Sequence, residues 1–180
     1  MGVLSEPPLL VISGLSGCGK TTYLEWLAGR GWTALNHDLI AGHGFVSNDL
    51  ERAWASTFEQ AGAPTVEPFL KRAAEWPQPI ALEFGFPMPL LPMVVGLRDA
   101  GASIWWFDGD RPAAKQAWRE RNATRAEPYP DAAWRIYVDS VDLNWPSICE
   151  VFGSHIIRVI GPGKWHLPPQ QIDRLILGTA

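Results

Sequence analysis

Short apolar runs separated by stretches with helical periodicity make up most of the chain. The continuous run at residues 9–13 is typical of a strand that is buried on both faces of a parallel sheet. Further strands are predicted at residues 32–36, 79–84, 103–108 and 155–160. Helices are predicted at about residues 20–28, 48–60, 66–76, 90–100, 111–123, 131–143 and 168–177. Because strands alternate with helices, the pattern predicts an α/β fold in three layers, with a five-stranded parallel sheet flanked by helices.

Local signals mark several helix ends. Asn48 and Glu51 have the spacing of a capping box, in which each side chain bonds a free backbone N–H of the first turn. Asp110 is expected to cap the helix at 111–123, where Pro112 lies in the first turn that tolerates proline. Pro146 is expected to kink or split the far end of the helix at 131–143.

Length and composition predict one domain spanning residues 1–180. The chain has 47% hydrophobic and 19% charged residues, so it can bury a core. Its formal charge of −4 argues against a protein that coats nucleic acid by charge alone, although it does not exclude a local basic groove. Most of the ten tryptophans are expected in the core. Trp26, Trp118, Trp134 and Trp145 are the main examples.

The compartment is predicted from the cysteines and the N-terminal segment. Cys18 and Cys149 lie far apart in the sequence, so a disulfide framework is not expected. Residues 1–8 contain no Lys or Arg and do not resemble a signal peptide, and no apolar run reaches membrane-spanning length. These features predict a soluble cytoplasmic protein without a membrane partner.

The turn after the first strand matches the phosphate-binding pattern G-x-x-x-x-G-K-[ST] at every fixed position. Its glycines let backbone N–H groups point at phosphate oxygens, and the helix that follows adds its N-terminal dipole. Lys20 is expected to reach the β- and γ-phosphates of ATP, and the hydroxyl of Thr21 to coordinate Mg²⁺. A turn that binds nothing is disfavoured, because a buried strand precedes it and a helix follows. The predicted nucleotide-binding residues here are Gly14, Leu15, Ser16, Gly17, Cys18, Gly19, Lys20, Thr21 and Thr22.

Cys18 is interpreted as a small residue that fills space inside this loop. Its position beside Lys20 and a helix N-terminus leaves open a lowered thiol pKa.

Asp38 follows the second strand at the sheet edge where ligands bind in parallel α/β folds. Its loop is expected beside the phosphate loop or one strand removed from it. A carboxylate there can accept the proton of an attacking hydroxyl, so Asp38 is predicted to be a general base that contacts the substrate. The alternative is an ordinary Asp of a loop or a helix cap.

Three arginines, Arg119, Arg121 and Arg125, come before a segment rich in proline. Residues 119–130 are predicted to form a small mobile lid, with Arg119 contacting the nucleotide. Arg121 and Arg125, spaced i and i+4, would share a face if the helix extended that far, and would stabilise the charge of the transferred phosphoryl group. A solvated basic helix end is the alternative.

The third strand ends in Glu83 rather than in the Asp that motor ATPases and GTPases use for the metal. A GTPase-type N-K-x-D segment is absent from the sequence. Glu83 is expected to contact the metal through water or to contact the substrate, and a structural role is an equal alternative.

With these motifs the chain resembles P-loop kinases of the nucleotide-kinase-like group. It is most similar to the kinase domain of phage-type polynucleotide 5′-hydroxyl kinases and to related DNA-base hydroxymethyl kinases. The resemblance rests on the phosphate loop, on residues 36–38 (Asn-His-Asp), on residues 121–125 (Arg-Asn-Ala-Thr-Arg), and on Pro130 with Arg135 and Tyr137.

The resemblance implies a role for several residues. Lys20 and Thr21 would hold ATP and Mg²⁺, Asp38 would activate the acceptor hydroxyl, and Arg125 would contact the transferring phosphate. The loop from Gly161 to Lys164 resembles a segment that packs on adenine, although it is equally a good turn. The chain departs from the family at Ala41, where the family has a substrate-binding arginine, and it lacks the family's phosphatase domain.

Together these features predict an ATP-dependent kinase that phosphorylates a hydroxyl of a nucleotide or nucleic acid. A kinase of a small metabolite or antibiotic is the first alternative. An ATPase or switch without an acceptor is the second, and it would bind Mg²⁺ through Glu83.

Overall fold

The computed structural model describes residues 9–44, 46–59 and 64–178. Its strands are β1 (Leu9–Gly14), β2 (Thr33–Asn36), β3 (Ile80–Glu83), β4 (Ser103–Gly109) and β5 (Ile156–Ile160). Its helices are α1 (Lys20–Ala28), α2 (His37–His43), α3 (Asp49–Glu59), α4 (Glu67–Ala74), α5 (Leu91–Asp99), α6 (Arg111–Asn122), α7 (Asp131–Leu143), α8 (Trp145–Phe152) and α9 (Pro169–Leu177), with the 3₁₀ turns η1 (Met88–Leu90) and η2 (Pro162–Lys164).

The five strands form one parallel sheet in the order β2-β3-β1-β4-β5. β1 lies in the centre and is buried along its whole length, as its continuous apolar run predicts. All carboxyl ends of the strands meet at one edge of the sheet, so the phosphate loop lies between the ends of β3 and β4. The loop after β2 is therefore one strand removed from the phosphate loop, with the end of β3 between them.

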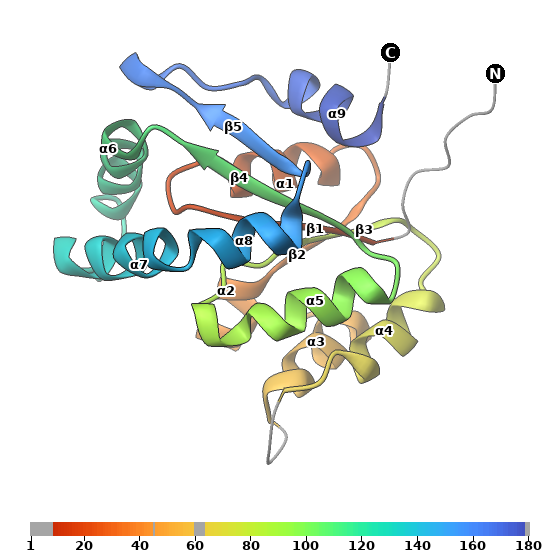
Figure 1. Ribbon diagram of the computed structural model, residues 1–180. Helices are drawn as coiled ribbons and strands as arrows, with labels where there is room; N and C mark the ends of the chain where they lie inside the picture. The colour runs from red at the N-terminus through yellow and green to blue at the C-terminus, as the bar shows by residue number, and fades with distance from the viewer. Residues whose placement is uncertain (1–8, 45, 60–63, 179–180) are drawn as a thin grey trace.

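Two consecutive residues of β4, which point to opposite faces of the sheet, show how the helices cover both faces. The ring of Phe107 contacts Tyr23 of α1, with 5.8 Å between ring centroids. The neighbouring Trp106 points to the opposite face, where its ring meets Phe152 and Trp145 of α8 at 5.4 and 6.5 Å. Figure 1 shows the resulting three layers, with α1 and α9 on one side of the sheet and α5 and α8 on the other. The predicted fold class is thus confirmed.

The structure corrects one predicted element and refines two others. Residues 37 and 38, expected in the loop that follows the second strand, begin helix α2, because the side chain of Asn36 caps the N–H of Leu39. The helix at 131–143 does split near Pro146, and α8 begins at Trp145. Asn48 caps α3 by accepting from the N–H of Glu51 at 2.9 Å, whereas the Glu51 carboxylate bonds Ser47 instead of Asn48.

The expected core tryptophans pack in the core. Trp118 and Trp134 are buried, and Trp26 and Trp145 are half-buried against the same cluster. Across the described residues, the structure contains no helix long and apolar enough to cross a lipid bilayer.

The close approach of two backbone segments fixes the start of the phosphate loop. Gly14 has a φ of +127°, and a Cβ atom there would lie 2.1 Å from the carbonyl oxygen of Phe107. The next residue, Leu15, donates its N–H to that same oxygen at 3.0 Å. Only glycine lets β1 turn into the loop while the loop stays bonded to β4.

We therefore expect Gly14→Ala to lower the free energy of unfolding by about 3 kcal/mol or more, since backbone strain and overpacking add. Gly31→Ala is the matched control, because Gly31 also has a positive φ (+88°) but open space around it. The control should lose only about 1 kcal/mol. Urea unfolding of both variants measures the difference, and equal losses would contradict the close approach.

Candidate active site

Cavities open at the carboxyl edge of the sheet on both sides of the phosphate loop. The α9 cavity, of about 520 Å³, is lined by Gly17, Cys18, Gly19, Thr21, Thr22, Tyr23, Ala117, Arg121, Val159, His166, Leu167, Pro168, Pro169 and Ile172. The Asp38 cavity, of about 470 Å³, is lined by Ser16, His37, Asp38, Trp118, Arg121, Arg125, Tyr129, Ala133, Trp134 and Tyr137. A smaller Lys20 cavity, of about 220 Å³, is lined by Ser16, Lys20, Asp38, Glu83, Gly85, Phe86, Pro87, Arg121 and Tyr137.

Lys20 is the first residue of α1 and lies under the phosphate loop, where it is buried. Its ammonium group donates to the carbonyl oxygens of Gly14 and Leu15, both at 2.9 Å. Burial lowers the pKa of Lys20, and the nearby carboxylate of Glu83 opposes that shift. The loop thus holds a cation at the point where the Lys20 cavity begins.

Glu83 ends β3 beside Lys20 and is also buried. Its two carboxylate oxygens accept hydrogen bonds from the hydroxyl of Thr21 at 3.1 Å and from the amide of Asn36 at 2.9 Å. Burial raises the pKa of Glu83, while Lys20 and the bond from Thr21 lower it. Its contact with Thr21 places Glu83 beside the predicted metal ligand, as the expected role near the metal requires.

Asp38 lies in the first turn of α2 and lines both the Asp38 cavity and the Lys20 cavity. The start of α2 is held by Asn36, which caps Leu39 with its amide oxygen and bonds Glu83 with its amide nitrogen. Hydrogen bonds therefore run from Thr21 through Glu83 and Asn36 to the helix that carries Asp38. Sequence reasoning gave Asn36 no role of its own, although it belongs to the Asn-His-Asp segment (residues 36–38) that carries the family resemblance.

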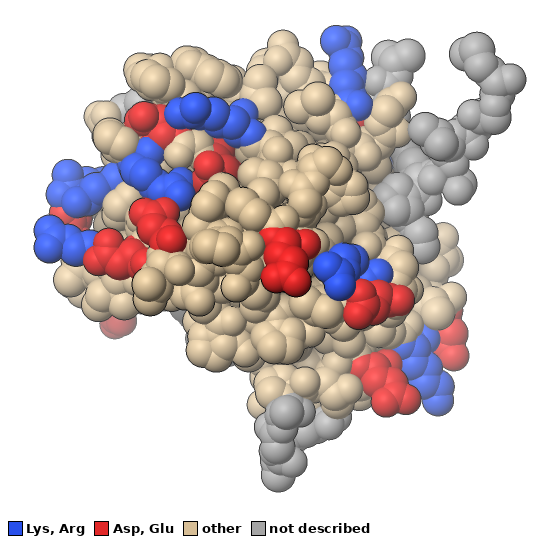
Figure 2. Space-filling model, in the orientation of Figure 1, with Lys and Arg blue, Asp and Glu red and all other residues tan. Residues whose placement is uncertain are grey.

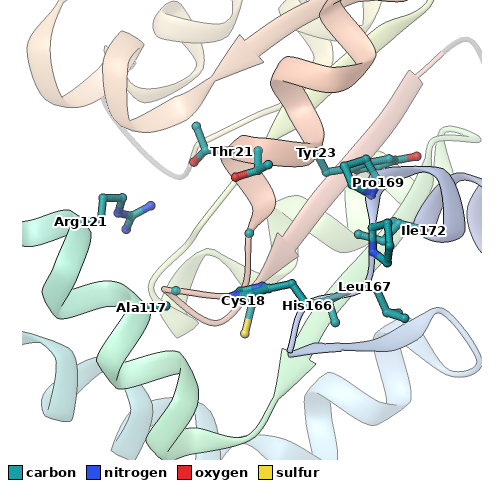
Figure 3. Close-up of a pocket in the computed structure, with 14 residues that line it drawn as sticks. Cys18, Thr21, Tyr23, Ala117, Arg121, His166, Leu167, Pro169 and Ile172 are labelled. Carbon is teal, nitrogen blue, oxygen red and sulfur yellow. The ribbon is translucent and has the colours of Figure 1, made fainter. Parts of the chain in front are cut away.

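The three arginines have different surroundings. Arg121 lines the α9, Asp38 and Lys20 cavities, so it lies where they meet, and Figure 3 shows it across the α9 cavity from Tyr23 and Pro169. Of these three cavities, Arg125 lines only the Asp38 cavity. Arg119 lines none of them; its guanidinium group pairs with Asp131 of α7, with Nε 3.0 Å from Oδ2. The structure therefore does not bring Arg119 to the predicted nucleotide site.

The segment predicted as a lid is tied to α6 at its far end. The buried Asn122 donates its amide to the carbonyl oxygen of Tyr129 at 2.8 Å and accepts from the N–H of Tyr129 at 3.0 Å. These bonds close residues 123–128 into a compact loop. The closing motion of the lid stays a prediction.

Helix α7 contacts the phosphate loop through the side chains of Trp134 and Tyr137. From the sequence, Trp134 was expected only to pack in the core, and Tyr137 was named only as part of the family resemblance. The indole of Trp134 donates to the carbonyl oxygen of Ser16 at 3.3 Å. The hydroxyl of Tyr137 donates to the carbonyl oxygen of Gly14 at 3.0 Å. Burial raises the pKa of Tyr137, so its hydroxyl stays protonated and keeps donating. Both residues also line the Asp38 cavity.

The residues after β5 that line the α9 cavity come later in the sequence than predicted. Gly161 is buried against the ring of Trp165 and does not line the cavity, and the side chain of Lys164 lies outside the part of the chain that the structure describes. The cavity wall is formed instead by residues 166–169 (His-Leu-Pro-Pro), shown in part in Figure 3. Sequence reasoning did not single out these residues.

The donors near Thr21 suit a magnesium ion. The hydroxyl of Thr21 and the carboxylate of Glu83 are hard oxygen ligands at the mouth of the phosphate loop. Within the described ranges, no group of three or more His, Cys, Asp or Glu side chains could hold a metal ion. Magnesium typically takes one or two protein oxygens and fills its shell with substrate phosphates and water, so the donor set fits.

Comparisons with known proteins identify the fold. No protein-family model matches the chain, and no curated protein matches its sequence. Several solved structures are similar to it. The chain superposes on a shikimate kinase from Bacteroides thetaiotaomicron with a TM-score of 0.59 and 15% identity, over 93% of this chain and 97% of that one.

Two further structures give the same picture. The tunicamycin resistance protein of Deinococcus radiodurans has a TM-score of 0.56 and 15% identity, over 96% of this chain and 95% of that one. A gluconokinase from Sinorhizobium meliloti has a TM-score of 0.55 and 13% identity, over 96% and 91%. These likenesses establish the fold of P-loop kinases and give no support to the narrower polynucleotide-kinase group.

Cys18 is buried inside the phosphate loop, which agrees with its interpretation as a filling residue. Burial raises the pKa of its thiol to about 12, and Lys20 opposes the shift only in part. The thiol is therefore protonated at neutral pH.

We expect Cys18 in the folded Cys149→Ala protein to react with iodoacetamide at pH 8 about a thousandfold more slowly than an ordinary thiol, because only the thiolate reacts. The rate should rise about tenfold per pH unit up to pH 10 without a plateau. In urea the same thiol should react at the ordinary rate. An ordinary rate in the folded protein would contradict the raised pKa.

Proposed function

We propose that the protein is an ATP-dependent kinase that transfers the γ-phosphoryl group to a hydroxyl of a small molecule. The observation that carries this proposal is the position of Arg121, where the α9 and Asp38 cavities meet at the phosphate loop. A phosphoryl group passing from one cavity to the other would pass this guanidinium group. Arginine at such a point stabilises the charge that spreads over the transferred oxygens.

The α9 cavity suits the nucleoside of ATP. Its wall away from the phosphate loop is apolar and comes from Leu167, Pro168, Pro169 and Ile172. A flat base can pack on such a surface while its phosphates reach the loop N–H groups and Lys20. Thr21 with Glu83 would hold Mg²⁺, which neutralises charge on the phosphates when bound.

The Asp38 cavity suits the acceptor. Asp38 also lines the smaller cavity that contains Lys20 and Glu83, so a hydroxyl held there would have a proton acceptor on one side and the phosphate loop on the other. Transfer would move the hydroxyl proton to the Asp38 carboxylate as the hydroxyl oxygen bonds the γ-phosphorus and ADP leaves.

A small acceptor is favoured over nucleic acid for two reasons. On the face shown in Figure 2, the basic side chains that gather at one end are interspersed with acidic ones, which weakens the attraction of that surface for a phosphodiester backbone. The similar structures that are named as kinases are named for small molecules, gluconate and shikimate. Both points support the first alternative drawn from the sequence over a nucleotide or nucleic-acid acceptor.

An ATPase without an acceptor has one observation in its favour, the contact between Glu83 and Thr21. That arrangement also serves a kinase, since both need a metal at the phosphates. The Asp38 cavity is what a simple ATPase does not require. The fate of the γ-phosphoryl group therefore separates the two functions.

We expect Asp38→Asn to lower turnover with an acceptor at least about a hundredfold while the KM for ATP changes little, the result expected for loss of a general base. Asp139→Asn is the matched control, because Asp139 is exposed on α7 and lines none of the three cavities. Transfer from γ-labelled ATP to a panel of hydroxylated small molecules measures the effect.

Two results would count against the proposed function. Label that appears only as inorganic phosphate would identify an ATPase. A KM for ATP that rises in step with the loss of turnover in Asp38→Asn would make Asp38 a metal or structural residue.

A further inference from the structure

Arg125 is a half-buried cation at the wall of the Asp38 cavity. Its guanidinium carbon lies 4.9 Å from the ring centroid of Tyr129, the geometry of a cation–π contact. Arg119, in the same segment, is neutralised by Asp131, whereas among the described residues no ion pair is formed by Arg125. The cavity therefore has a cation that lacks a counter-ion of its own.

The place of Arg125 separates its role from that of Arg121. Arg121 lines all three cavities, so it is available to the phosphates. Arg125 is absent from the walls of the α9 and Lys20 cavities and faces only the space assigned to the acceptor. This position suits an interaction with the acceptor itself better than one with the transferred phosphoryl group.

The loop holds Arg125 in position without help from a ligand. Asn122 bonds both backbone groups of Tyr129, and the ring of Tyr129 in turn supports the guanidinium group. A planar guanidinium group fixed in this way can bond a carboxylate or phosphate through two N–H groups, with little side-chain entropy left to lose.

The charge balance of the cavity favours an anion. Its lining contains two guanidinium groups, those of Arg121 and Arg125, against one carboxylate, that of Asp38. The rest of the wall includes the aromatic side chains of Trp118, Trp134 and Tyr137, which suit a compact carbon skeleton. A neutral acceptor would leave Arg125 without a partner in a partly desolvated site.

We propose that the acceptor carries an anionic group, a carboxylate or a phosphate, in addition to its reactive hydroxyl, and that Arg125 binds this group. The inference rests on the proposed function and narrows its substrate class. It assigns Arg125 to acceptor recognition rather than to the transferring phosphate, the role that the family resemblance implied.

Matched pairs of acceptors test the inference with γ-labelled ATP: a sugar acid and its alditol, a sugar phosphate and its sugar, and a nucleoside monophosphate and its nucleoside. The first pair reports on a carboxylate and the other two on a phosphate. The variants are Arg125→Gln, Arg125→Lys and, as a control for charge, Arg135→Gln, because Arg135 is exposed on α7 and lines none of the three cavities.

We expect the wild-type enzyme to use the anionic member of at least one pair, with a KM at least about tenfold below that of the neutral member. Arg125→Gln should raise the KM for the anionic member about 10- to 100-fold, the range for a lost charge-assisted hydrogen bond, and change kcat less. The KM for the neutral member should not change. Arg125→Lys should lie between the two, and Arg135→Gln should match the wild type.

Equal use of both members of every pair, or an Arg125→Gln enzyme that loses kcat with an unchanged KM, would overturn the inference and leave the proposed kinase intact. Label that reaches water alone would overturn the kinase assignment and the inference with it. The two failures therefore give different results.

Discussion

The carbonyl group of Gly14 is the point on which the site depends. It accepts hydrogen bonds from the ammonium group of Lys20 and from the hydroxyl of Tyr137, so it joins α1 and α7 to the end of β1. The absence of a Cβ atom at Gly14 lets that carbonyl occupy its position against Phe107 of β4. If the phosphate loop began at another residue, the ammonium group of Lys20 and the hydroxyl of Tyr137 would lose this shared acceptor.

The strand order gives Glu83 its role. Because β3 lies between β1 and β2, its last residue stands between the phosphate loop and the helix that carries Asp38. Glu83 bonds Thr21 on one side and Asn36 on the other. Two hydrogen bonds thereby connect the predicted metal ligand to Asn36, the residue that caps α2. The cost is a buried carboxylate with a raised pKa, which the cation of Lys20 offsets in part.

The arginine segment combines three different tasks over a few residues. Arg119 joins α6 to α7 through Asp131, Arg121 faces the junction of the cavities, and Arg125 faces the Asp38 cavity. The end of α6 separates them, because the chain leaves the helix after Asn122 and the loop that follows is closed by the bonds of Asn122 to Tyr129. The i, i+4 spacing of Arg121 and Arg125 would place them on one face only in a helix that reached residue 125, and α6 ends before it.

The sequence by itself determined the layers, the strands and the phosphate loop, because these follow from local periodicity and from a turn that only glycines permit. It did not determine the helix that begins directly at residue 37, because that start depends on a cap from Asn36 rather than on an apolar pattern. Nor did it distinguish Trp134, whose helical spacing is that of any core residue, although its indole bonds the phosphate loop. Only the tertiary structure brought Glu83, Asn36 and Thr21 together and separated Arg119 from the other two arginines. Side-chain partners distant in sequence are set by strand order and helix packing, which no local pattern encodes.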